Sequence, residues 1–82
     1  MAYLVPRGQP LMLPAGTEIV QDARTWAIYY NPGLNCTWLA WNVPNGVEVM
    51  QLPGHYNVSY NLNQLSSYIQ SRQAYACEEC RE

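Results

Sequence analysis

The sequence predicts an α+β fold, in which a small antiparallel sheet of three to four strands packs with one C-terminal amphipathic helix. Aromatic and β-branched residues fill the centre of the chain, and turn signals rich in Asn, Pro and Gly divide it into short segments. After Asn61 the apolar residues recur at helical spacing. With 82 residues, we expect one small domain over residues 17–82 and an extended, Pro-rich N-terminal arm over residues 1–16.

The arm is expected because prolines interrupt the start of the chain. They exclude a helix and a central strand there, and they stand at Pro6, Pro10 and Pro14. Leu4–Gly8 reads like a thrombin-cleavage linker, but Gln9 stands where serine usually follows, and we interpret the match as chance. After the Ala15–Gly16 turn, residues 17–21 suit a short edge strand.

The centre of the chain predicts consecutive strands joined by hairpins. Residues 31–35 suit a five-residue loop, and residues 44–46, Pro-Asn-Gly, suit a three-residue loop built on a type I turn. After the Pro53–Gly54 break, residues 56–60 alternate as Tyr, Asn, Val, Ser, Tyr, which indicates one further strand. The expected strands are Trp26–Tyr30, Cys36–Val43, Val47–Leu52 and Tyr56–Tyr60.

A helix is expected over residues 62–77. Asn61 is a good N-cap, and Gln64 three residues later completes a capping box. The inner face of this helix is thin, and most of it consists of Leu62, Leu65 and Ile69.

The two hairpin loops predict a register in which Tyr30 pairs with Cys36 and Ala40 pairs with Met50. One sheet face then collects large and small apolar residues that the helix can cover, namely Trp26, Ile28, Tyr30, Cys36, Trp38, Ala40, Met50 and Leu52. The opposite face is also apolar, with Ala27, Tyr29, Thr37, Leu39, Trp41, Val43, Val47 and Val49. An antiparallel sheet with one wet side normally alternates apolar and polar residues, so this opposite face needs a cover.

Three covers are open: the N-terminal arm, a second copy of the chain, or another protein. The arm would use Leu11, Met12, Leu13, Ile19 and Val20. If a partner covers the face, Trp and Tyr are the residue types that most often dominate the binding energy, so Trp41 and Tyr29 are the expected anchors. The predicted partner-binding residues are Trp41, Tyr29, Leu39, Val47 and Val49.

Charge narrows the list of partners. Six acidic residues and four arginines, without lysine, give a net charge of −2, and only 12% of residues are charged. A basic groove for nucleic acid cannot be built from four scattered arginines, so we expect no nucleic-acid partner. The chain has no apolar run of about 18 residues and no signal-peptide pattern, so we expect no membrane partner. The expected location is the cytoplasm, or the host cytoplasm for a viral chain.

Little in the sequence indicates catalysis or a cofactor. Cys77 and Cys80 form a C-x-x-C pair, but they follow a helix C-terminus, where the thiol pKa is not lowered. A zinc site of Cys36, His55, Cys77 and Cys80 is the weaker alternative to an inert tail. No Ser-His-Asp spacing or phosphate-binding loop occurs, so we expect no enzyme, no cofactor and no metal.

The sequence therefore predicts a non-enzymatic protein-binding factor, accessory or inhibitory, that acts through the apolar aromatic sheet face on another protein or on a second copy of itself. Its small size favours an origin in a virus or mobile element. Two alternatives stay open: a module or sponge that binds a nucleoside or glycan, and a self-assembling structural subunit.

Overall fold

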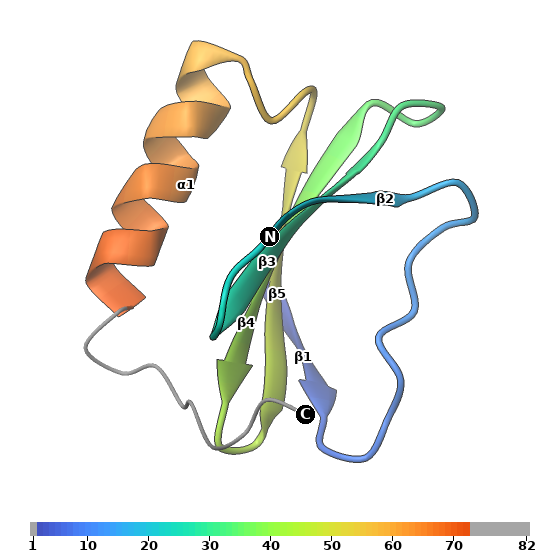
Figure 1. Cartoon of the computed structure of the whole chain (residues 1–82), viewed down its shortest axis with the longest axis vertical. Coiled ribbons are helices and arrows are strands. Elements are labelled where there is room, and N and C mark those ends of the chain that lie inside the picture. The colour runs from blue at the N-terminus through green and yellow to red at the C-terminus, as the bar shows by residue number, and fades with distance from the viewer. Residues whose placement is uncertain (1, 73–82) are drawn as a thin grey trace.

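The computed structural model describes residues 2–72, which form a five-stranded antiparallel sheet with one helix packed on one face (Figure 1). The spatial order of the strands is β1-β5-β4-β3-β2, so β2 to β5 form a meander and β1 returns to pair with β5. The α+β class is confirmed, with five strands instead of three to four. The elements are β1 (Ala2–Pro6), β2 (Glu18–Asp22), β3 (Trp26–Asn31), β4 (Cys36–Val43), β5 (Gly46–Pro53) and α1 (Ser59–Arg72).

The additional strand, β1, lies where the sequence predicted only an extended arm. It pairs with β5 from Ala2 opposite Met50 to Pro6 opposite Gly46. Pro6 fits because it is the last residue of an edge strand, where a missing amide hydrogen costs little. Residues 7–17, called the connection below, link the two edge strands on the side of the sheet opposite α1 (Figure 1).

The predicted register is wrong by one residue on both sides of β4. Tyr30 pairs with Thr37 instead of Cys36, and Ala40 pairs with Val49 instead of Met50. Both loops are one residue shorter than expected, because Asn31 stays in β3 and Gly46 already pairs in β5. A one-residue slip moves every side chain of a strand to the other face, so β4 is inverted relative to the prediction.

The inversion places Trp41 in the core between the sheet and α1. Trp41 is 0% exposed and Leu39 is 1% exposed. The Trp41 ring stacks on that of Trp26, with 6.4 Å between the centroids and 9° between the planes. This core is completed by Ile28, Leu52 and Leu65, with Met50, Tyr56, Tyr68 and Ile69 around it.

The segment before α1 differs from both predictions made for it. Residues 56–60 are a turn and the start of the helix instead of a fourth strand, and Leu62 is exposed. Asn61 is not the N-cap but lies buried in the first helical turn. Its Nδ2 donates to the carbonyl oxygens of Pro53 and His55, at 2.9 and 3.0 Å. The buried Asn61 side chain thus satisfies two carbonyl groups of the turn, so Asn61 closes the corner between β5 and α1.

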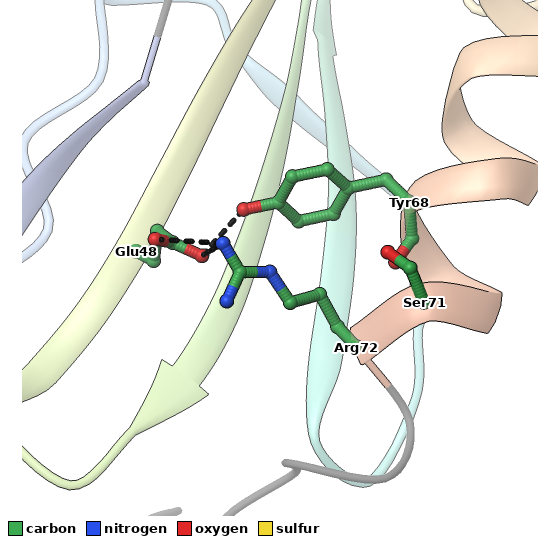
Figure 2. Close-up of polar contacts among 4 residues, drawn as sticks. All are labelled: Glu48, Tyr68, Ser71 and Arg72. Atoms are coloured by element: carbon green, nitrogen blue, oxygen red, sulfur yellow. Dashed lines mark hydrogen bonds and ion pairs between the residues drawn. The ribbon is translucent and has the colours of Figure 1, made fainter.

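The last turn of α1 is held to β5 by Glu48 (Figure 2). The Tyr68 hydroxyl donates to the Glu48 carboxylate, and Nη2 of Arg72 lies 3.2 Å from the same carboxylate. The Arg72 guanidinium also lies 5.1 Å from the centre of the Tyr68 ring. Burial, followed by the hydrogen bond to Glu48, raises the pKa of Tyr68.

This raised pKa predicts weaker folding at alkaline pH. The phenol is protonated in the folded state at pH values where an unfolded tyrosine, with a pKa of about 10, already ionises. The contribution of the Tyr68 phenol to the free energy of unfolding is therefore complete below pH about 10. It is lost as the pH rises through the folded-state pKa. We expect the free energy of unfolding to fall less steeply above pH about 10 in Tyr68→Phe than in the wild type, as measured by urea titration. Parallel curves for the two chains would contradict this.

The face of the sheet opposite α1, called the second face below, is partly covered by the connection. Leu11, Leu13 and Val5 pack there against Trp38, Ala40 and Val49. Met12, between the two leucines, is 76% exposed, and Ile19 and Val20 are exposed as well. The connection therefore covers this face only in part. Within residues 2–72, no helix has the length and hydropathy needed to cross a membrane.

Candidate functional site

The part of the second face that the connection leaves open is a groove of about 710 Å³. Its floor crosses four strands, β5, β4, β3 and β2, and its lining also includes Pro6, the last residue of β1, and the first residues of the connection. Adjacent strands lie about 4.8 Å apart, so the floor extends over roughly 14 Å. The groove is lined by Pro6, Arg7, Gly8, Gln9, Leu11, Ile19, Asp22, Trp26, Ala27, Tyr29, Ala40, Asn42, Gly46 and Val47.

Two alanines create a hollow in the floor of the groove. Ala27 and Ala40 are direct partners across β3 and β4, and both are buried. Side chains that pair across a sheet stand next to each other on one face, so two methyl groups leave a hollow that larger partners would fill. The hollow thus follows from residue size at one cross-strand pair.

The walls of the groove are apolar. Tyr29 and Val47 are half-buried and rise from β3 and β5, Ile19 is exposed on β2, and Leu11 comes from the connection. A tyrosine side chain offers a large apolar ring and a polar tip, which suits a site that is partly wet. The groove therefore has an apolar interior with an aromatic wall.

Polar and charged groups occupy the rim. Arg7 lies at the β1 edge and Asp22 at the β2 edge, and Asn42 and Gln9 lie between them. Arg7 comes close to the β4–β5 hairpin because position 46 is glycine. A Cβ atom there would collide with the Val5 carbonyl oxygen and would lie 2.8 Å from the Arg7 amide nitrogen.

The structure separates the five residues predicted to bind a partner. Tyr29 and Val47 line the groove. Val49 is on the same face but is 0% exposed among the side chains that the connection covers. Leu39 and Trp41 lie on the other side of the sheet, in the core beneath α1, because of the inverted β4.

Sequence reasoning missed Ala27, Ala40 and Arg7 as groove residues. Alanine is depleted in strands, so two alanines within strongly aromatic strands were the available signal for a hollow. No signal indicated Arg7, because its place depends on β1 pairing with β5.

The structure places two of the four suggested zinc ligands outside any metal cluster. The His55 ring packs against the rings of both Tyr30 and Tyr56, and its Nδ1 accepts a hydrogen bond from the Asn57 amide. Cys36 is a half-buried free thiol. Within residues 2–72, no three His, Cys, Asp or Glu side chains are grouped to hold a metal ion, and Cys77 and Cys80 lie outside the described residues.

Comparison with known proteins found no matching family model, no matching curated protein and no matching solved structure. The fold and the groove are therefore the basis for assigning a function.

Proposed function

We propose that this chain is a non-enzymatic protein-binding domain and that its groove holds a short apolar segment of another protein. The observation that carries the proposal is the hollow over the Ala27–Ala40 pair, with the Tyr29 ring beside it. Aromatic residues next to small apolar hollows are typical anchor points of protein interfaces. The partner is the same class that the sequence predicted, but only Tyr29 and Val47 of the predicted residues serve it.

The length and chemistry of the groove favour a peptide segment. Roughly 14 Å of floor matches about four residues of extended chain at about 3.3 Å per residue. The described lining residues include no Ser, Thr, Cys, His or Lys, so they offer few groups for nucleophilic or acid–base catalysis. Leu11 lines the groove and its backbone amide makes no hydrogen bond with any described residue, and such an amide can pair with an extended segment.

The sheet edges are less suited to binding than the groove. The register of β2 shifts between Ile19 and Gln21, and β1 ends in Pro6. Bulges and prolines are common devices that prevent edge strands from pairing with other chains. The partner is thus expected on the second face instead of at an edge.

A second candidate function is the binding of a small uncharged molecule in the same groove. Its volume of about 710 Å³ falls within the range of small-molecule sites, roughly 300–1,000 Å³. The sequence suggested a nucleoside or glycan as such a molecule, and the Tyr29 ring offers a surface on which either could stack.

The proposal is tested by selecting random short peptides from an mRNA-display library on the immobilised chain. We expect enriched peptides that bind the wild type and lose about tenfold or more in affinity to Ala40→Leu, because the leucine fills the hollow. Tyr29→Ala should weaken the binding of the same peptides, because it removes the aromatic wall without filling the hollow. Leu34→Ala, at an exposed position in the β3–β4 loop, is the matched control and should bind as the wild type does.

Circular dichroism and urea midpoints show whether each variant is folded, and Tyr29→Ala replaces Ala40→Leu if the latter does not fold. Failure to enrich any peptide, or peptides that bind all variants equally, would overturn the proposal. Thermal stabilisation by a panel of nucleosides and monosaccharides, absent in Ala40→Leu, would instead establish the second candidate.

A further inference from the structure

The cation at the end of the groove points to the chemistry of its occupant. Arg7 follows β1 directly and lines the groove beside Gly46 and Val47. Its Nε and Nη2 both donate to the carbonyl oxygen of Pro44, at 3.3 and 3.1 Å, and its amide donates to the carbonyl oxygen of Asn45 at 2.9 Å. The β4–β5 hairpin thus holds both the backbone and the side chain of Arg7.

The partner of the Arg7 guanidinium is neutral. Among the described residues its side chain bonds only to the Pro44 carbonyl, and no described carboxylate forms an ion pair with it. By contrast, the Arg72 guanidinium lies against the Glu48 carboxylate. A guanidinium has five N–H donors, and its planar fork matches a carboxylate. Arg7 therefore has donors left for an anionic group that enters the groove.

The charges of the groove are asymmetric. Arg7 is its only cation among the described lining residues, and Asp22 lies at the far end, on the opposite edge strand. The floor between them is uncharged. A segment with a carboxylate at one end and apolar residues behind it matches this arrangement in one direction only, since a cation lies only at the Arg7 end of the described lining.

On the premise of the proposed function, we propose that the segment held in the groove carries a carboxylate that binds Arg7, with apolar residues lying over the Ala27–Ala40 pair. The carboxylate comes either from an Asp or Glu side chain or from the C-terminus of the partner. Its role is to fix the direction and position of the segment, because charge-assisted hydrogen bonds are stronger and more directional than neutral ones.

The test uses the peptides selected on the wild-type chain, remeasured with Arg7→Gln. Glutamine removes the charge but retains an N–H that can reach the Pro44 carbonyl. We expect an acidic residue or a free C-terminus at one constant position in the peptides and about fivefold to tenfold weaker binding to Arg7→Gln. Amidated peptides and Asp-to-Asn peptides separate the two sources of the carboxylate.

A charge exchange provides the decisive measurement. Arg7→Glu should reject the acidic peptides and bind peptides in which lysine replaces the acidic residue, to within about threefold of the original affinity. Added salt should weaken wild-type binding but not binding to Arg7→Gln. Peptides that lose binding to Ala40→Leu yet are neutral and indifferent to Arg7→Gln would overturn this inference and leave the proposed function intact. Self-association of the wild type that Arg7→Gln abolishes would identify a second copy as the occupant and would overturn the proposal that the segment belongs to another protein.

Discussion

Trp41→Ala is expected to lower the free energy of unfolding by about 3–5 kcal/mol, the cost typical of deleting a large buried side chain. Trp41 is 0% exposed and stacks on Trp26 beneath α1, so its removal leaves a cavity between the sheet and the helix. An 82-residue domain has a total stability of roughly 4–12 kcal/mol, so this variant should lose a large fraction of its stability. Urea denaturation followed by circular dichroism measures the loss.

Two further variants control for this result. Trp41→Phe should cost much less, because it keeps an aromatic ring and because the indole Nε1 has no hydrogen-bond partner among residues 2–72. Leu34→Ala should change stability by less than about 0.5 kcal/mol, since Leu34 is exposed. If Trp41→Ala kept the wild-type midpoint but no longer bound the selected peptides, Trp41 would be a surface anchor and the observed register of β4 would be contradicted.

Gly46→Ala is expected to detach the end of β1 and to weaken the groove together with the fold. Gly46 has a φ of 147°, where side chains are strained, and a Cβ would lie 2.9 Å from the carbonyl carbon of Pro6. These neighbours are backbone atoms of the adjacent strand, so β1 must move away. Strain and the loss of the hydrogen bond from the Arg7 amide to Asn45 together suggest a cost of about 2–4 kcal/mol.

Hydrogen exchange of the Arg7 amide measures this detachment directly, and the selected peptides report its effect on binding. We expect faster exchange and weaker binding in Gly46→Ala. Leu34→Ala is the control for peptide binding, because Gly8 itself lines the groove. For exchange and stability the matched control is Gly8→Ala, since Gly8 also has a positive φ, 91°, but a Cβ there would meet nothing within 4 Å. It should cost only the backbone strain, about 1 kcal/mol. Equal effects of the two substitutions would show that close approach of β1 is not the reason for glycine at position 46.

Much of the sheet was predictable because the side chains of β3 and β5 lie on the predicted faces relative to each other. The register error is one residue between β3 and β4 and one residue between β4 and β5. The two errors cancel, so the pairing of β3 residues with β5 residues across β4 keeps the predicted faces. Tyr29 and Val47 therefore share a face as predicted, and so do Ile28 and Leu52. Only the side chains of β4 were assigned to the wrong faces, and Trp41 was the most consequential among them.

The groove itself could not be predicted to the same extent. It needs β1 at the edge of the sheet, the connection over the second face, and Arg7 beside the β4–β5 hairpin. All three depend on contacts between segments far apart in the sequence, such as the bond from Arg7 to Pro44, 37 positions away. Local propensity and periodicity carry no information about such pairings.

The sequence by itself determined the α+β class, the hairpin strands and the helix, because aromatic strands, turn residues and helical spacing are local signals. It also determined that both faces of the sheet are apolar, since apolar residues occupy successive strand positions. Tertiary structure decided which face each β4 residue occupies, since loop length sets the register and one residue inverts a strand. It also decided that the N-terminal residues form an edge strand and cover only part of the second face, which leaves the groove open.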